Sequence, residues 1–273
     1  MSSFNNKTVL VTGGASGIGR LMGIKALEAG AANLVVWDID EQAMQALKHE
    51  QKAYTDHIHT FHVDISDPQQ IEKSSQEVLN RLGTIDILVN NAGVVTGKEF
   101  SKQSKEEIQQ TIDINIAGVM HTTHAFLPAM IEQQSGHIVN ISSAISLMAN
   151  PGMSVYAGSK WAVTGWSESL RLELEAINKN LRVTTVQPSY INTGMFEGVK
   201  APLLTPMLEP NAIAEAIIKA VKKNKIVLRK PFMVKLTPFL KGILPGRLFD
   251  FIAGRLFKVY ASMNSFKGRT SND

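Results

Sequence analysis

The chain of 273 residues contains no cysteine, which excludes disulfide bonds and thiolate chemistry. It has no run of about 18 apolar residues that could span a membrane, and its first residues lack the apolar stretch of a signal peptide. His121 and His124 have ligand-like spacing on an expected helix, but no third candidate metal ligand lies nearby. We therefore expect a cytoplasmic protein without a metal site.

Acidic residues are scarce near the C-terminus. Among residues 222–269, Asp250 is the only acid beside twelve Lys or Arg, which gives this part a formal charge of +11. The whole chain carries +4, so the remainder carries −7. Such a basic segment suits nucleic acid or an anionic membrane surface, and its many aliphatic residues favour the membrane.

Apolar runs typical of buried parallel strands alternate with helical patterns along the chain. These runs cover residues 9–11, 33–38, 59–63, 85–89, 137–141 and 183–187. The alternation predicts one α/β domain over residues 1–231, with a doubly wound parallel sheet of about seven strands and helices on both faces. Ligands of such sheets bind at the carboxyl ends of the strands.

Glycines follow the first apolar run in the spacing Gly-x-x-x-Gly-x-Gly, at Gly13, Gly17 and Gly19. They free the backbone and let the first N–H groups of the next helix approach an anion, for which a pyrophosphate is the natural candidate. Ser16 and Ile18 belong to the same expected contact surface. The spacing differs from Gly-x-Gly-x-x-Gly, so by itself it fits a tight turn equally well.

Asp38 ends the second predicted strand, about 20 residues after the glycines, where dinucleotide folds place an acid on the adenosine ribose. A carboxylate there would repel a 2′-phosphate, so we predict NAD rather than NADP. The alternative role, as the N-cap of the helix that begins near Glu41, suits Asp40 better.

Small and polar residues follow the fourth apolar run, residues 85–89. Asn91, Ala92 and Gly93 form a corner that permits close backbone approach to a ligand. Asn115 lies among apolar residues on a helix expected over 106–130, so its amide needs partners.

Ser143 follows the fifth apolar run, residues 137–141. Tyr156 and Lys160 come next, on a helix expected over 154–176. Spaced by four residues, the phenol and the ammonium share one helix face. A nearby positive charge favours the phenolate, so Tyr156 can exchange a proton with an alcohol or carbonyl oxygen that Ser143 holds.

In this order the residues closely resemble the classical short-chain dehydrogenase/reductase family, over Lys7 to about Pro231. The matching positions are Thr12 to Gly19, Asp64, Asn90 to Gly93, Asn115, Ser143, Tyr156, Lys160, Pro188 and Thr193. The resemblance implies a Rossmann fold, a nicotinamide dinucleotide and a homodimer or homotetramer. Ser189 departs from the family, which usually has glycine there, and we expect a tighter nicotinamide pocket.

The resemblance also implies a role for each matching residue. Tyr156 is similar to the general acid/base and Ser143 to the residue that orients the substrate oxygen. Lys160 resembles the group that binds the nicotinamide ribose and lowers the pKa of the tyrosine, and Asn115 the holder of a relay water. The remaining cofactor contacts implied are Asp64 and Ile65 at the adenine, Asn91 to Gly93 at the adenosine, and Pro188, Ile191 and Thr193 at the nicotinamide.

Two segments outside the catalytic set bear on the substrate. Residues 194–210 are apolar, contain two prolines and predict a lid over a lipophilic pocket, with a loop that adds no selectivity as the alternative. Residues 232–273 predict a basic extension of short amphipathic helices, broken at Pro238 and Pro245. These helices suit a lipid surface or a partner subunit equally well.

This extension and the pair Trp37-Asp38 resemble the branch of retinol and 17β-hydroxysteroid dehydrogenases. We therefore predict an NAD-dependent oxidoreductase that interconverts an alcohol and its carbonyl on a retinoid, a steroid or a long-chain alcohol or aldehyde. Two alternatives stay open: a 3-oxoacyl reductase that uses NADPH, and a non-catalytic NAD-binding protein of lipid surfaces.

Overall fold

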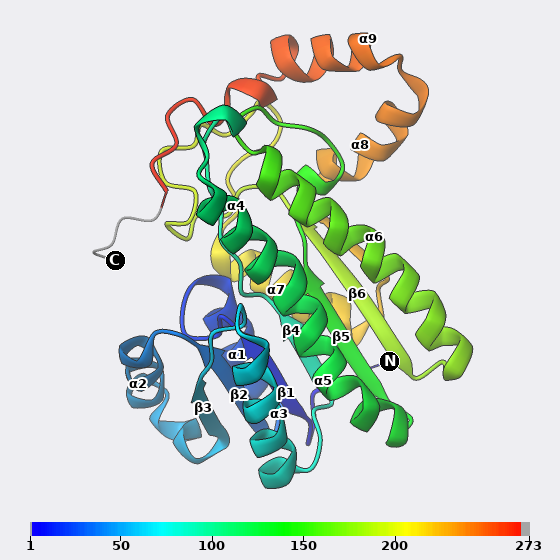
Figure 1. Cartoon of the computed structure of the whole chain (residues 1–273). Helices are drawn as coiled ribbons and strands as arrows, with labels where there is room; N and C mark the ends of the chain where they lie inside the picture. The colour runs from blue at the N-terminus through cyan, green and yellow to red at the C-terminus, as the bar shows by residue number, and fades with distance from the viewer. Residues whose placement is uncertain (1, 269–273) are drawn as a thin grey trace.

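The computed structural model, which describes residues 2–268, contains a seven-stranded parallel sheet (Figure 1). The strand order is β3-β2-β1-β4-β5-β6-β7. The strands are β1 (Thr8–Thr12), β2 (Asn33–Asp38), β3 (Ile58–His62), β4 (Ile87–Asn90), β5 (Gly136–Ile141), β6 (Leu181–Pro188) and β7 (Val227–Lys230). This confirms the predicted fold class. Of the basic C-terminal segment, Arg269 and the residues after it lie outside the described part.

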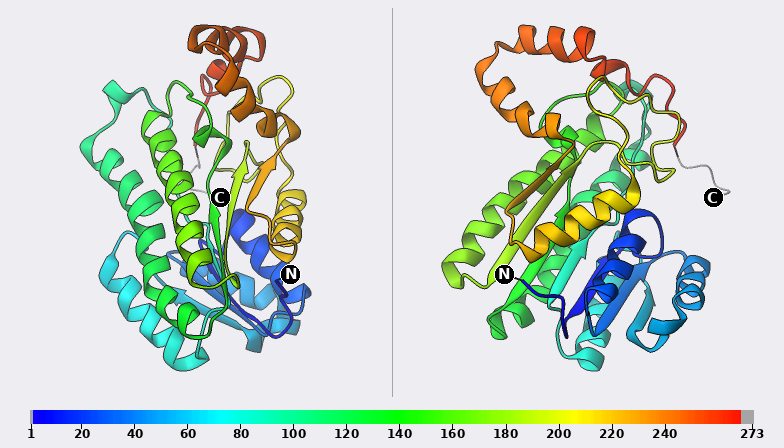
Figure 2. Two further views of the ribbon diagram at one scale, coloured as in Figure 1. Left: turned by 90° about the vertical axis from the view of Figure 1, so that its right-hand side faces the viewer. Right: turned by 180° about the vertical axis from the view of Figure 1, so that it is seen from behind.

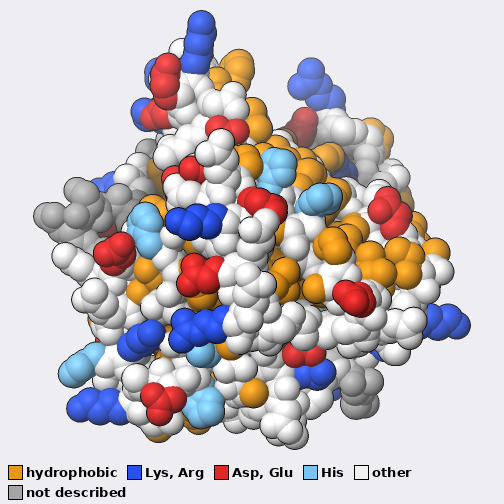
Figure 3. Space-filling model, turned by 60° about the horizontal axis from the view of Figure 1, so that its bottom comes forward, with side chains coloured by type: hydrophobic (Ala, Val, Ile, Leu, Met, Phe, Trp, Pro, Cys, Tyr) orange, Lys and Arg blue, Asp and Glu red, His pale blue; other side chains and the backbone are white. Residues whose placement is uncertain are grey.

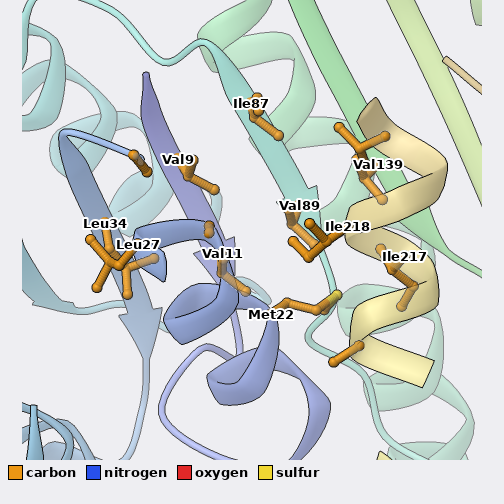
Figure 4. Packing of buried hydrophobic residues seen from close by; sticks show 14 of the residues in the cluster. Val9, Val11, Met22, Leu27, Leu34, Ile87, Val89, Val139, Ile217 and Ile218 are labelled. Atoms are coloured by element: carbon orange, nitrogen blue, oxygen red, sulfur yellow. The ribbon is translucent and has the colours of Figure 1, made fainter. Parts of the chain in front are cut away.

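Helices cover both faces of the sheet because side chains alternate along each strand. One face packs against α1 (Gly17–Glu28), α2 (Glu41–Glu50) and α7 (Pro210–Lys222), as Figure 4 shows for Val9, Met22 and Ile217. The other face packs against three further helices through residues such as Leu10 and Phe126. These helices are α3 (Pro68–Leu82), α5 (Val119–Glu132) and α6 (Ser154–Ile177).

Helix starts follow local side-chain chemistry. Asp67 accepts hydrogen bonds from the backbone N–H groups of Gln69 and Gln70, at 2.8 and 3.3 Å, and Pro68 occupies the first turn. Asp40 caps α2 by accepting from the N–H of Ala43 at 2.9 Å. This confirms the N-cap assignment of Asp40 and leaves Asp38 free of that role.

The helix predicted over 106–130 is not continuous. It is divided into α4 (Lys105–Ile112) and α5, with one turn of π-helix between them at Asp113–Gly118. Gly118, at the end of this turn, permits close approach of the chain after β3, because a Cβ there would lie 2.5 Å from the carbonyl oxygen of Ile65. The turn carries Asn115, so the wider helical turn coincides with a residue of the predicted site.

After β7 the chain forms α8 (Phe232–Ile243), α9 (Gly246–Phe251) and a π-helical turn, Ile252–Leu256, which together we call the arch. The arch stands beyond the carboxyl end of the sheet in all three ribbon views (Figures 1 and 2). Pro238 lies inside α8, so the predicted break at this residue was wrong, while Pro245 does separate α8 from α9. Within residues 2–268, none of the helices has the length and apolar character needed to cross a bilayer.

The segment after the arch returns to the predicted lid and pairs with its backbone. The N–H of Leu203 donates to the carbonyl oxygen of Phe257 at 3.0 Å, and the N–H of Lys200 donates to that of Ser262 at 3.1 Å. The ring of Phe266 packs on Gly97 so closely that an added Cβ would lie 2.1 Å from it. Residues 257–267 and the lid therefore form one wall beside the carboxyl ends of the strands.

Candidate active site

A single cleft at the carboxyl ends of the strands brings together most of the residues singled out from the sequence. The predicted residues that line it are Gly13, Ser16, Gly17, Ile18, Asp38, Asp64, Ile65, Asn91, Ala92, Gly93, Ser143, Tyr156, Lys160, Pro188, Ile191 and Thr193. Gly19 and Asn115 are not among the lining residues. Both lie directly behind the residues that line the cleft.

The glycine turn is held in shape by the chain that follows β4. Gly13 has a φ of +61°, a conformation that favours glycine, and its N–H donates to the carbonyl oxygen of Trp37 at 2.7 Å. The side-chain amide of Asn91 donates to the carbonyl oxygens of Thr12 and Gly13, at 3.0 and 3.1 Å. Asn91 therefore fixes the turn, and the start of α1 faces the cleft with its N–H groups available to an anion.

Gly19 contributes to this turn by its lack of a side chain. A Cβ at position 19 would lie 2.1 Å from the carbonyl oxygen of Gly13 and 2.5 Å from the Asn91 amide nitrogen. In the structure Gly19 allows close packing of the helix against the turn, and the cofactor contact predicted for it stays a prediction.

Gly19→Ala is expected to destabilise the protein by about 1–3 kcal/mol, because the added methyl overpacks the turn. Gly242→Ala is the matched control, since nothing lies within 4 Å of a Cβ at this exposed position of α8, and alanine there is expected to stabilise by about 0.5–1 kcal/mol. Urea unfolding of both variants measures the difference. Equal stability of the two variants would contradict the packing argument.

Asp38 is fixed at the end of β2 with its carboxylate in the cleft. One oxygen accepts from the N–H of Ala15 at 2.9 Å and the other from the N–H of Asp40 at 3.1 Å. Among the described residues that line the cleft, the other charged ones are Asp64 and Lys160. The end of the cleft near Asp38 and Asp64 is therefore negative, and the positive charge lies at the opposite end.

Tyr156 is 6% exposed and lies beside Ser143 at the positive end of the cleft. Burial raises the pKa of the phenol. A hydrogen bond with Ser143 lowers this pKa in part, and the neighbouring Tyr190 raises it further. The Ser143 hydroxyl has only long contacts with the backbone, 3.3 Å to the N–H of Ile145 and 3.5 Å to the carbonyl oxygen of Pro188. Beyond its hydrogen bond with Tyr156, the hydroxyl is therefore available to a substrate oxygen.

Lys160 points its ammonium into the same corner. Its Nζ donates to the carbonyl oxygen of Ile141 at 3.0 Å and lies 5.7 Å from the centre of the Tyr156 ring. Burial lowers the pKa of Lys160 to about 8. The sequence predicted that this lysine would lower the pKa of the tyrosine; in the structure burial is the largest influence on that pKa, and it raises the pKa.

Asn115 is completely buried and its amide is satisfied. Its oxygen accepts from the N–H of Val94 at 2.8 Å, and its nitrogen donates to the carbonyl oxygen of Val94 at 2.9 Å and to the Ser159 hydroxyl at 3.1 Å. Ser159 in turn donates to the carbonyl oxygen of Tyr156 at 2.7 Å. The side chain thus joins the loop after β4 to the first turns of α6, and the relay water predicted for Asn115 stays a prediction.

A smaller apolar pocket continues from Ser143 and Tyr156 towards the lid. The ring of Phe196, a residue of the predicted lid, lies 6.3 Å from that of Tyr156. Sequence reasoning missed Tyr190, whose ring lies 5.1 Å from that of Phe196. It also missed that the chain after residue 231 reaches the pocket, through Val234, Thr237 and Val259. No local pattern marks these contacts of the C-terminal segment, since they join distant parts of the chain.

Comparison with known proteins supports the interpretation of this cleft. The family model described as "short chain dehydrogenase" matches residues 7–203. A solved structure titled as a short chain dehydrogenase/reductase from Burkholderia phymatum in complex with NAD superposes with a TM-score of 0.81 and 24% identity, over 93% of this chain and 97% of that one. At this identity the superposition shows the fold.

Curated relatives are more similar in sequence. Short-chain dehydrogenase/reductase family 16C member 6 of Bos taurus is 39% identical over 86% of this chain and 76% of its own length. Human epidermal retinol dehydrogenase 2 is 36% identical, with 93% and 83% covered. Human estradiol 17-beta-dehydrogenase 11 is 30% identical, with 97% and 88% covered. The chain therefore belongs to the short-chain dehydrogenase/reductase family of oxidoreductases, and within it to the branch of the retinol and 17β-hydroxysteroid dehydrogenases.

Proposed function

We propose that this oxidoreductase interconverts a lipophilic alcohol and its carbonyl compound with NAD(H). The observation that carries the proposal is the position of Tyr156: its phenol lies where the cleft meets the apolar pocket, with Ser143 beside it and Lys160 one helical turn away. A proton donor, an oxygen-binding hydroxyl and a buried cation at one point are what carbonyl reduction requires.

The residues that line the cleft suit the parts of a dinucleotide. The N-terminus of α1 suits the pyrophosphate, and Asp38 offers acceptor oxygens for ribose hydroxyls. NAD is favoured over NADP because Asp38 and Asp64 make this end negative, and no Lys or Arg occurs there among the described lining residues. At the opposite end Lys160, Pro188, Ile191 and Thr193 are placed to hold the nicotinamide nucleoside.

The bound dinucleotide supplies or accepts the hydride. Tyr156 donates its phenolic proton to the carbonyl oxygen in reduction and accepts the alcohol proton in oxidation, while Ser143 donates a hydrogen bond to the same oxygen. Burial keeps the phenol protonated at neutral pH, which suits its role as an acid, and excludes water from the reacting atoms.

The lining of the smaller pocket supports a lipophilic substrate. Beyond Ser143 and Tyr156 it consists largely of apolar side chains, among them Ile145, Met153 and Phe196. The retinol and estradiol named for two relatives are both lipophilic alcohols. We further propose a homo-oligomer, which exposed apolar residues on α6 such as Trp161 and Leu172 support.

The test is a paired titration of the purified protein with NADH and NADPH, followed by turnover of retinol, a 17β-hydroxysteroid and a long-chain alcohol with the preferred cofactor. We expect tighter binding of NADH and turnover of at least one of the three. NADPH preference with turnover of 3-oxoacyl thioesters would favour a 3-oxoacyl reductase instead. NADH binding without turnover of any alcohol or carbonyl compound would indicate a non-catalytic role.

A further inference from the structure

Helix α8 of the arch exposes one apolar stripe. Phe232, Leu236, Phe239 and Ile243 follow each other at spacings of four, three and four residues, which places them on one side of the helix. Phe239 and Ile243 are 65% and 64% exposed. The stripe continues on the rest of the arch with exposed Leu248 and Leu256.

Basic side chains accompany this stripe. Lys235 lies against the ring of Phe232, with its Nζ 5.7 Å from the ring centre, and Arg247, Arg255 and Lys258 follow on the rest of the arch and directly after it, all exposed. The one acid of the region, Asp250, accepts a hydrogen bond from the Tyr260 hydroxyl at 2.7 Å. On the lower face of the molecule, by contrast, acidic and basic side chains are interspersed (Figure 3).

We propose that the arch is a docking surface for anionic phospholipid bilayers. Exposed aromatic and aliphatic side chains flanked by Lys and Arg insert at the boundary between headgroups and acyl chains, and the basic groups are attracted by lipid phosphates and carboxylates. A second copy of the chain is a poorer occupant. A two-fold contact of the arch with itself would bring like charges together.

The same helix connects this surface with the pocket beside Tyr156. Val234 and Thr237 line the pocket from the side of α8 opposite to Phe239, as the turn of 100° per residue requires. A lipophilic substrate dissolved in the bilayer is thereby brought within about one helix diameter of the pocket. This consequence rests on the proposed function, whereas the docking itself does not.

The experiment is flotation of the purified full-length protein with vesicles of phosphatidylcholine alone and of phosphatidylcholine with 30% phosphatidylserine. We expect the wild type to float with the anionic vesicles and to be released by high salt. The double variant Phe239→Glu/Ile243→Glu is expected to bind at least about tenfold more weakly, since it removes two inserted apolar groups and adds two repelled charges. The matched control is Phe100→Glu/Ile226→Glu, which makes the same changes at exposed residues outside the arch.

Each outcome of the flotation experiment supports or contradicts binding of the arch to anionic bilayers. Loss of flotation in the arch variant alone supports the proposal, even if no alcohol is turned over. A wild type that stays with the soluble fraction, or an arch variant that floats like the control, overturns it. An arch variant that sediments as a smaller species than the wild type, with neither of them floating, would identify the arch as a subunit interface instead.

Discussion

Tyr156→Phe is expected to lower kcat by about 10²–10⁴-fold, because the variant keeps the ring but loses the group that exchanges a proton with the substrate oxygen. NADH affinity is expected to change little, since Lys160 and the residues of the glycine turn stay in place. Steady-state kinetics and a binding titration measure the two effects separately. The fold is expected to be unchanged, as Phe fills the same buried site.

Tyr54→Phe is the control for this change, because Tyr54 is only partly buried and lies before β3, away from the cleft. Wild-type turnover by Tyr156→Phe would exclude the phenol as the acid/base. The pH dependence offers a second check: since burial raises the pKa of Tyr156, alcohol oxidation should accelerate as the pH rises through the neutral and alkaline range, and Tyr156→Phe should lose this dependence.

Asp38→Asn is expected to shift the NADPH/NADH affinity ratio towards NADPH by about 10²-fold, because it removes a charge that would repel the 2′-phosphate. Asparagine has nearly the same shape, and its carbonyl oxygen still accepts one of the two backbone N–H groups that hold Asp38. The fluorescence of bound reduced cofactor reports both affinities.

Asp40→Asn is the matched control, since this carboxylate caps α2 and does not line the cleft. It is expected to keep the ratio of the wild type. An unchanged ratio in Asp38→Asn as well would show that Asp38 does not govern the ribose site. The preference would then have to come from elsewhere in the cleft.

The sheet and the cleft could be predicted because both depend on local signals. A strand that is buried on both faces is a continuous apolar run, and residues directly after parallel strands meet at one edge whatever the distance between them in the sequence. Asp38, Asn91 and Ser143 were all found in this way. Tyr156 and Lys160 needed only the helical period in addition.

The features that the sequence analysis missed depend on backbone geometry, long-range contacts and burial, which local sequence patterns do not show. A single π-helical turn at Asp113–Gly118 has almost the same apolar periodicity as an α-helix, so the prediction ran straight through it. Pro238 removes one backbone hydrogen bond but does not end α8. The pairing of residues 257–267 with the lid joins segments about 60 residues apart, as in Leu203 and Phe257. The pKa of Tyr156 depends on burial, which only the folded chain reveals.

The strand order has a consequence for how such an enzyme can evolve. Because the chain crosses from β3 to β4 past β1, the residues before β4 build the half of the cleft with Asp38 and Asp64, and the residues after it build the half with Ser143, Tyr156 and the pocket. The acids that bear on the choice between NAD and NADP thus lie in the first half of the cleft, and the side chains that would meet the substrate lie in the second. Cofactor choice and substrate choice are therefore separable traits, and selection can change one while the other is preserved.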